Sequence, residues 1–311
     1  MTSASNVAFG VALVLYLGAM LLLFHHLAFR RRSSWLAGTS LATVGVTVHL
    51  TSVVLRGAAA GRVPWGNMYE YASVVGLLVV AGALVIERVA GVRGPTGFAI
   101  GVAVLGMGAA TMLYVPPGPL VPALNSYWLR IHVLAAMIGS SLFILGTVFT
   151  VLYLIRERSE RRATPPPAPV PAMAAVGVGG LPEDYAEGAD AVDSGPGRPR
   201  EPRRSRLPAA AVLDRLAYRT IAFAFPVWTF AVIAGAIWAE EAWGRYWAWD
   251  PKEVWAFVTW ALFASYLHAR ATVGWRGRKA AFLVLLGFGA LVFNLIVVNL
   301  AVSSLHGYAG V

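Results

Sequence analysis

Long apolar segments separated by short polar stretches form the dominant pattern along this chain. A hydrocarbon core about 30 Å thick needs about 20 apolar helical residues to cross it. Eight segments reach that length: residues 7–29, 35–55, 68–87, 97–115, 130–155, 217–239, 253–273 and 279–304. They lack the period-two alternation of a β-barrel wall, and a helix satisfies its own backbone hydrogen bonds in lipid. The pattern therefore predicts an all-α, polytopic integral membrane protein with about eight transmembrane helices.

One long polar stretch, residues 156–214, interrupts this pattern between the fifth and sixth apolar segments. It holds ten prolines, an acidic patch around Glu183 and a basic run from Arg198 to Arg206. Such a composition buries too little apolar surface to order a chain. We therefore predict a disordered linker between a five-helix part, residues 1–155, and a three-helix part, residues 215–311. Its basic end is able to bind anionic lipid headgroups, although a solvated tether is the simpler interpretation.

Composition supports a membrane location, and the placement of charge orients the chain. Of the 311 residues, 58% are hydrophobic and 13% are charged, and the mean hydropathy of +0.66 exceeds what a water-soluble domain tolerates. Twenty of the 25 Lys and Arg residues lie on the side of the Arg30–Arg32 loop. The positive-inside rule thus predicts a linker in the cytoplasm, with both termini and residues 240–255 on the outer face of the cytoplasmic membrane. Because the basic residues have this orienting role, they do not indicate a nucleic-acid partner.

The chain contains no cysteine. It therefore offers no disulfide, no thiolate ligand and no thiol exchange of its own, so any thiol chemistry comes from a partner or a substrate. The first apolar segment, residues 7–29, is longer than the core of a signal peptide, and the arginines from Arg30 to Arg32 follow it rather than precede it. We expect this segment to be retained as a helix.

A tryptophan-rich loop, residues 240–255, follows the sixth segment. Each indole offers a broad apolar face and one N–H donor, so a cluster of indoles forms a platform for a large flat ligand. An interfacial aromatic belt explains one or two tryptophans at each helix end, but it explains this dense group less well. The candidate ligand contacts in the loop are Trp243, Tyr246, Trp247, Trp249 and Trp255.

Four polar residues mark the outer starts of two helices. Asp250 precedes a proline and is followed three residues later by Glu253, which is the pattern of a capping box. Asn67 and Glu70 repeat this spacing at the third segment, and we predict that they form a second wall of the same outer site. For Asp250 and Glu253 a capping role and a ligand role are both open, since a rigidly capped helix would also hold the tryptophans still.

Two of the six histidines lie on the same side as the tryptophan-rich loop. His132 is at the outer start of the fifth segment, and His306 lies just beyond the outer end of the eighth. Two imidazoles that approach from opposite sides supply the axial ligands of a haem iron. Either histidine alone is explained equally by a wet polar residue at the membrane surface, so the hypothesis depends on the pair and the loop together.

The other histidines are separated by their depth. His268 lies about 22 Å along the seventh segment, given the rise of a helix, where an ionisable residue is a functional candidate. Packing against a neighbouring helix or Arg270 explains it equally. His49 in the second segment is a weaker candidate, and we assign no role to His25 and His26 near the triple arginine.

Several short motifs resemble those of one known family. They are Trp243–Glu253 with Trp255 and Trp260, Tyr266–Arg270, Ser126–His132, Asn67–Glu70 and Leu305–Tyr308. With this tryptophan-rich (WWD) motif, which is highly specific, the chain resembles the haem-handling proteins of cytochrome c biogenesis of the CcsA (ResC) type, found in the System II cytochrome c synthase. The resemblance runs from about residue 45 to the end of the chain and excludes the linker.

This resemblance implies a path for haem b. Haem made inside the cell would pass an inner membrane site that has His268 as a ligand. It would then reach an outer site under the tryptophan-rich loop, with His132 and His306 as axial ligands. The second histidine of the inner site would come from a partner membrane subunit of the CcsB (ResB) type.

The resemblance also implies a reaction. An apocytochrome c would present a Cys-X-X-Cys-His segment, whose thiols add to the vinyl groups of haem. No residue of this chain looks like a nucleophile or a general base with a matched partner, so its contribution would be proximity and orientation. We therefore expect this chain to be one subunit of a two-subunit cytochrome c synthase. That synthase would depend on a separate thiol reductant. The chain would either catalyse the attachment or only export haem and present it. Both roles use the same binding site, so both interpretations stay open.

Two other function classes fit a polytopic membrane protein. A haem electron carrier of the cytochrome b type places paired histidines about half a bilayer apart on one helix, and no apolar segment here carries such a pair. A small-molecule transporter predicts broken helices and inverted repeats. Pro226 is a candidate break in the sixth segment, but no repeat matches it. Both classes therefore rank below the synthase.

Overall fold

The computed structural model describes residues 1–119, 124–163 and 207–302. Within these ranges the regular elements are helical, which confirms the predicted all-α class. The helices are α1 (Thr2–Phe29), α2 (Arg32–Ala60), α3 (Met68–Ala90), α4 (Pro95–Thr111), α5 (Tyr127–Ala163), α6 (Ala210–Trp243), α7 (Pro251–Ala271) and α8 (Arg278–Val292), which continues through the π-helical turn η3 (Phe293–Val297) into α9 (Val298–Ala301).

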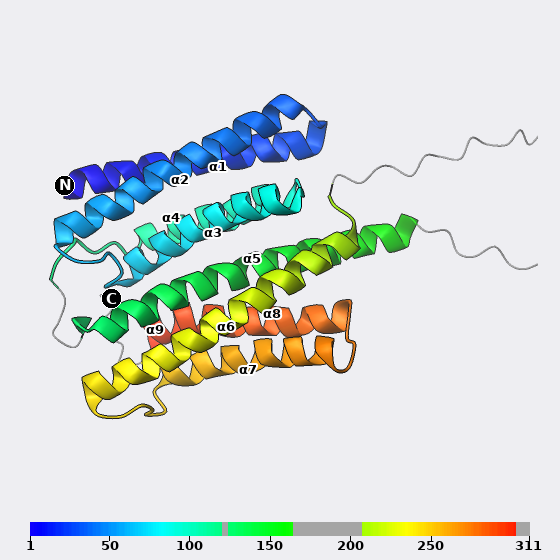
Figure 1. The fold of residues 1–311 in the computed structure, drawn as a ribbon. Coiled ribbons are helices and arrows are strands. Elements are labelled where there is room, and N and C mark those ends of the chain that lie inside the picture. The colour runs from blue at the N-terminus through cyan, green and yellow to red at the C-terminus, as the bar shows by residue number, and fades with distance from the viewer. Residues whose placement is uncertain (120–123, 164–206, 303–311) are drawn as a thin grey trace, which may run out of the picture.

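Consecutive helices run antiparallel in an elongated bundle (Figure 1). Contacts join α1 to α2, α3 to α4, α5 to α6 and α7 to α8, and α5 also contacts α3 and α8. The α5–α6 pair therefore connects the first four helices to the last two. One end of the bundle carries the N-terminus and the loop after α6, residues 244–250, and we call it the tryptophan end. The opposite end, which holds Arg30, Arg93 and residues 272–277, is the arginine end.

Six helical segments of the described chain are long and apolar enough to cross a membrane, which makes the protein polytopic. Two of the eight predicted spans differ from these six. The span predicted over residues 97–115 ends at Thr111 and leaves a helix of 17 residues, because Pro116 and Pro117 prevent its continuation. The span predicted over residues 253–273 forms α7, but the charged residues and His268 near its ends lower its hydropathy below that of the other six.

The predicted linker begins and ends inside helices. α5 continues to Ala163, where an ion pair of Arg161 with Glu157 at 2.7 Å stabilises its last turns. α6 already begins at Ala210. The structure thus shortens the linker predicted over residues 156–214 at both ends, and residues 164–206 of it lie outside the described residues.

Backbone signals end the helices on both sides of the tryptophan-rich loop. Gly244 adopts the left-handed conformation, with φ of 69°, and its N–H donates to the carbonyl of Glu240 at 2.7 Å, which ends α6. Asp250 and Pro251 then start α7. The irregular loop is therefore residues 244–250, and the rest of the predicted range is helical.

A shared aromatic core holds α5, α6 and α7 in place. Phe143 of α5 stacks on Phe263 of α7 with ring centroids 3.7 Å apart, and the edge of Trp228 of α6 meets Phe143. Gly146 of α5 lies so close to Ile221 of α6 that an added Cβ would come within 2.5 Å of its side chain. Small residues at such positions let helix backbones approach closely, so the faces of these three helices are held in a definite register.

Candidate functional site

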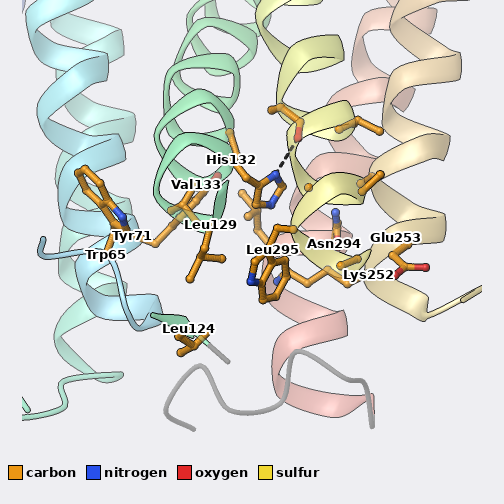
Figure 2. A pocket seen from close by; sticks show the side chains of 18 of the residues that line it. Trp65, Tyr71, Leu124, Leu129, His132, Val133, Lys252, Glu253, Asn294 and Leu295 are labelled. Atoms are coloured by element: carbon orange, nitrogen blue, oxygen red, sulfur yellow. Dashed lines mark hydrogen bonds between the residues drawn. The ribbon is translucent and has the colours of Figure 1, made fainter. Parts of the chain in front are cut away.

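An apolar cavity of about 200 Å³ lies at the tryptophan end between α3, α5, α6, α7 and η3 (Figure 2). Its aromatic lining consists of Trp65, Tyr71, Trp228, Trp238, Tyr246 and Trp247. Its polar lining includes Asn67, His132, Lys252, Glu253 and Asn294. Apolar walls with a few convergent polar groups are typical of ligand sites, but such sites usually enclose about 300–1,000 Å³. A large flat ligand would therefore extend beyond the mouth of this cavity.

The imidazole of His132 is held in one orientation on the wall of the cavity. Its Nδ1 lies 2.7 Å from the carbonyl oxygen of Ala231, and its ring stacks on Trp238 with an interplanar angle of 11°. Gly235 makes room for the ring, because a Cβ there would lie 2.7 Å from two imidazole atoms. A carbonyl only accepts hydrogen bonds, so Nδ1 carries a proton; in the neutral ring Nε2 then carries the lone pair, as in a metal-ligating histidine.

The tip of the tryptophan-rich loop lies at the mouth of the cavity. Tyr246 and Trp247 line the cavity, and 61% and 36% of their surfaces are exposed. Trp249 does not line it, although its ring contacts Trp247 edge to face at 5.5 Å, and 77% of its surface is exposed. Its φ of 59° is uncommon for a bulky residue. Because strained backbone of this kind clusters at ligand clamps, the loop has the character of a binding segment.

Two other predicted tryptophan contacts lie behind the cavity wall. Trp243 packs edge-on against Trp238 with ring centroids 4.8 Å apart, and Trp255 packs against Phe293 of η3 at 4.1 Å. Neither residue lines the cavity. Trp243 packs on a residue that lines the cavity, and Trp255 packs on a residue next to one that does. Both tryptophans therefore form a second layer behind the lining.

Asp250 and Glu253 form the predicted capping box. The side chain of Asp250 accepts the backbone N–H of Lys252 at 3.0 Å, and Oε2 of Glu253 accepts the backbone N–H groups of Ala248 at 2.8 Å and Asp250 at 3.4 Å. The capping role is thus confirmed for both residues. Glu253 also lines the cavity, whereas Asp250 does not.

Replacing Asp250 separates its two predicted roles. Asn caps helices about as well as Asp, whereas Ala costs about 0.5–2 kcal/mol. If the residue acts as a cap, Asp250→Ala lowers the thermal unfolding midpoint of the purified protein and Asp250→Asn leaves it near the wild-type value. If the negative charge also contacts a ligand, Asp250→Asn keeps its stability but loses ligand binding.

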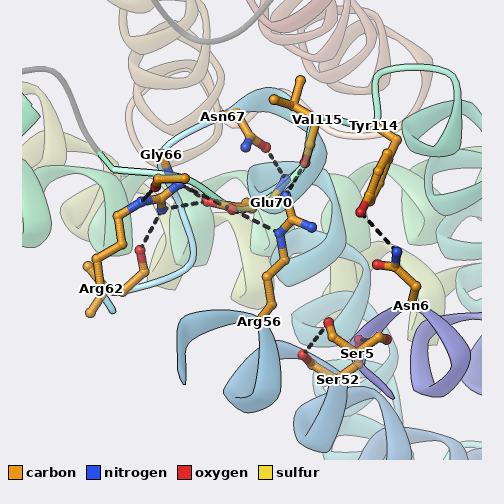
Figure 3. Close-up of polar contacts among 12 residues, drawn as sticks. Ser5, Asn6, Ser52, Arg56, Arg62, Gly66, Asn67, Glu70, Tyr114 and Val115 are labelled. Atoms are coloured by element: carbon orange, nitrogen blue, oxygen red, sulfur yellow. Dashed lines mark hydrogen bonds and ion pairs between the residues drawn. The ribbon is translucent and has the colours of Figure 1, made fainter. Parts of the chain in front are cut away.

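Glu70 is buried away from the cavity and serves as the centre of an ion cluster (Figure 3). Its carboxylate accepts from Arg56 Nε and Arg62 Nη1, both at 2.8 Å, and from the backbone N–H of Gly66 at 2.7 Å. Its own N–H donates to the side chain of Asn67, which caps α3 and lines the cavity. The predicted second wall thus consists of Asn67, while Glu70 holds the backbone next to it.

Arg56 and Arg62 are not among the predicted site residues, and both lie at the tryptophan end. In the structure their guanidinium groups reach a second loop, where Arg56 donates to the carbonyl of Val115 and Arg62 Nε donates to the carbonyl of Gly118 at 2.9 Å. The cluster therefore ties the loop before α3 to the loop after α4. Trp65, which lines the cavity, belongs to the first of these loops.

Of the other two predicted iron ligands, the structure describes only His268. His268 is exposed on α7, near the arginine end, and is not among the residues that line the cavity. Its neighbour Arg270 forms a two-point ion pair with Asp214 of α6 at 2.6 and 2.9 Å. His306 lies outside the described residues.

The remaining histidines have structural partners. His49 is fully buried and its Nε2 hydrogen-bonds Ser73 of α3 at 3.0 Å. His25 bonds Ser34 at 2.8 Å, and His26 bonds the carbonyl of Arg31 at 2.9 Å. None of them lines the cavity.

Several residues that line the cavity were not predicted from the sequence. One signal in the sequence could have identified four of them. Trp228, Ala231, Gly235 and Trp238 recur at spacings of three or four residues, which places them on one face of α6. On such a helix face, the small residues let a neighbouring helix approach closely, and the large aromatic residues beside them leave room for a cavity. By contrast, Tyr71 of α3 joins the site through packing alone.

Comparison with known proteins identifies the family. A family model described as cytochrome C assembly protein matches residues 4–306. The cytochrome c biogenesis protein CcsA of Gloeobacter violaceus is 34% identical over 302 residues, which cover 87% of this chain and 84% of that protein. The CcsA protein of Synechococcus elongatus is 35% identical over 296 residues, which cover 86% of this chain and 87% of its own length.

A solved structure shares the fold. The cytochrome c heme lyase CcmF matches with a TM-score of 0.67 at 16% identity, and the match covers 99% of this chain and 49% of that one. The chain thus spans about half the length of that protein, and at this identity the likeness concerns the fold alone. The family match and the CcsA relatives together show that the chain belongs to the cytochrome c assembly protein family, as a membrane protein of cytochrome c biogenesis of the CcsA type.

Proposed function

We propose that this chain is the haem-handling subunit of a cytochrome c synthase, which holds haem b at the tryptophan end and presents it for thioether attachment to apocytochrome c. The observation that carries the proposal is the setting of His132. Its Nδ1 proton is directed to the carbonyl of Ala231 at 2.7 Å in an aromatic cavity, so the Nε2 lone pair suits a haem iron. The relatives named for cytochrome c biogenesis support the same interpretation.

The candidate residues take separate roles in this proposal. Tyr246 and Trp247 contact the flat face of the haem ring at the mouth of the cavity, while Trp249 shields its exposed edge. His306 supplies the second axial ligand. His268 belongs to an inner haem site that a CcsB (ResB)-type subunit completes. An ionisable side chain exposed on a transmembrane helix is costly in lipid, so the exposure of His268 favours a partner that covers this face of α7.

The attachment reaction requires no nucleophile from this chain. Each thiol of the Cys-X-X-Cys-His segment adds across a vinyl group of haem: a carbon–sulfur bond forms, the thiol proton passes to the terminal vinyl carbon, and no net oxidation occurs. The chain contributes to a two-subunit haem lyase by fixing the orientation of the ring, which supplies the proximity effect. Because the chain has no cysteine, a separate reductant keeps the substrate thiols reduced.

The tryptophan end faces outward in this proposal. Of the 20 Lys and Arg residues that the structure describes, 15 belong to the helix ends and turns at the arginine end. The positive-inside rule then places the arginine end in the cytoplasm and the cavity on the outer face, where apocytochrome c is matured. The synthase thus works in the cytoplasmic membrane.

The absorption spectrum of the purified protein, alone and with its partner subunit, tests the proposal. We expect wild type to hold haem with a six-coordinate, low-spin spectrum. His132→Ala and His306→Ala are each expected to lose this spectrum and to regain it with added imidazole, because imidazole occupies the missing axial position.

His26→Ala is the matched control for this experiment. Like His132, His26 bonds a backbone carbonyl through Nδ1, at 2.9 Å, but it lies at the arginine end. Its removal is expected to leave the spectrum unchanged. A wild type that carries no haem even when purified with its partner would contradict the proposal and return the tryptophan-rich loop to an interfacial role.

A further inference from the structure

The cavity has one cationic corner, formed by Lys252 of α7 beside Asn294 of η3 (Figure 2). Asn294 is only 4% exposed, and its Oδ1 has no hydrogen-bond partner among the described residues. Most of the remaining wall is aliphatic or aromatic. An ammonium group beside such a wall is costly unless an anion or a hydrogen-bonding group meets it.

The position of Lys252 is set by the π-helical turn. Its Nζ donates to Oδ1 of Asn299, and the Nδ2 of Asn299 donates to the carbonyls of Leu295 at 2.7 Å and Asn294 at 3.3 Å. Since those carbonyls only accept, the amide of Asn299 must direct its oxygen to Lys252. π-helical turns inside α-helices are frequent at functional sites, and this one supplies the support for a single lysine.

The two acidic residues nearest to Lys252 in the chain accept backbone N–H groups. Oε2 of Glu253 accepts two backbone N–H groups of the loop, and its carboxylate points away from His132 (Figure 2). Asp250 accepts the backbone N–H of Lys252 as the cap of α7. Among the described residues Lys252 takes part in no ion pair, and an ammonium has three N–H groups, of which Asn299 takes one. The corner therefore suits a carboxylate ligand.

We propose that Lys252, supported by Asn299, is a carboxylate-recognition residue that binds a propionate of haem; this inference rests on the proposed function. Haem b carries both propionates on one edge of an otherwise apolar ring, which matches an apolar cavity with one cationic corner. Water that accompanies the carboxylate donates to the buried Oε1 of Glu253 and Oδ1 of Asn294, both of which lack a partner among the described residues. Holding that edge fixes where the vinyl groups lie, so Lys252 determines the orientation of haem for attachment.

A comparison of haem with its dimethyl ester tests this inference, because the ester lacks the negative charges. Both ligands are titrated into the purified full-length protein, with its partner subunit, and binding is followed by absorbance. A charge-assisted hydrogen bond leads us to expect that wild type binds haem about tenfold more tightly than the ester. Lys252→Met is expected to bind both ligands equally while keeping a low-spin spectrum, and Lys252→Arg to retain the preference.

Two further variants serve as a second test and a control. Asn299→Leu removes the support of Lys252 and is expected to weaken the preference for haem. Lys279→Met removes a lysine at the arginine end, where its ammonium lies 6.0 Å from the centre of the Trp275 ring, and is expected to leave the preference unchanged. A preference that persists in Lys252→Met, or that is missing in wild type, overturns the inference. A wild type that binds neither ligand instead overturns the proposed function.

Discussion

Replacing Gly235 by alanine is expected to lower covalent haem attachment to cytochrome c about a hundredfold, the loss that a catalytic group misplaced by about 1 Å can cause. A Cβ at this position would lie 2.7 Å from both Cε1 and Nδ1 of His132. The imidazole would have to leave the carbonyl of Ala231 and its stacked position on Trp238. The yield of haem-stained cytochrome c per amount of synthase, measured in cells that lack their own synthase, gives the result.

Gly289→Ala is the matched control for this substitution. Gly289 also lies inside a helix, α8, but an added Cβ there meets no atom within 4 Å. Both replacements gain about 1 kcal/mol of helix propensity, so the difference between them reports the contact with His132. Equal attachment by the two variants would show that the position of His132 does not limit the reaction.

Glu70→Gln is expected to destabilise the protein by about 3–5 kcal/mol, the usual effect of removing one partner from a buried ion pair. The Glu70 side chain is fully buried, and those of Arg56 and Arg62 are only 4% and 13% exposed. A neutral amide would leave two guanidinium groups without a counter-charge in this setting. The measurement is the thermal unfolding midpoint of the purified protein in a single detergent.

Glu157→Gln provides a comparison with the same local chemistry at the surface. Glu157 also receives two arginines, Arg161 at 2.7 Å and Arg278 at 3.1 Å; its own side chain is 12% exposed, but those of the arginines are 66% and 57% exposed, so solvent screens the charges. Exposed ion pairs contribute about 0–1 kcal/mol, so only a small shift of the midpoint is expected. If both glutamines lower the midpoint equally, burial does not explain the stability that Glu70 contributes.

The Glu70 cluster also links stability to the site. Glu70 holds the N–H of Gly66, and the residues on either side of Gly66, Trp65 and Asn67, line the cavity. The loop before α3 is therefore kept in place by charge, while the walls on α5 and α6 are kept in place by close packing.

The helices were predictable because each apolar segment carries its own signal. Hydropathy over about 20 residues decides whether a segment can enter lipid, and caps such as Asp250 with Pro251 are visible in a few adjacent letters. Helix ends set by other contacts were less predictable. α5 reaches Ala163 through the pair of Arg161 with Glu157, and α6 starts at Ala210, well before the predicted residue 217.

The site was predictable only in part. Asn67, His132, Tyr246, Trp247 and Glu253 line one cavity, because each belongs to a motif near a helix end at the tryptophan end of the bundle. The motif by itself does not reveal which side of the chain a residue faces. Glu70, Trp243 and Trp255, which belong to the same motifs, therefore turn out to pack behind the wall.

Local and cumulative properties are what the sequence by itself determined: the all-α membrane class, most of the apolar spans, the helix caps Asn67 and Asp250, and the end of the bundle at which most of the candidate residues gather. These properties follow from hydropathy, charge and residue order, which do not depend on contacts with distant parts of the chain. Only the tertiary structure decided that Gly235 seats His132, that two arginines converge on Glu70, and that Asn299 supports Lys252. Each depends on which helix faces meet or on where a helix changes its winding, and no local pattern in the chain specifies those contacts.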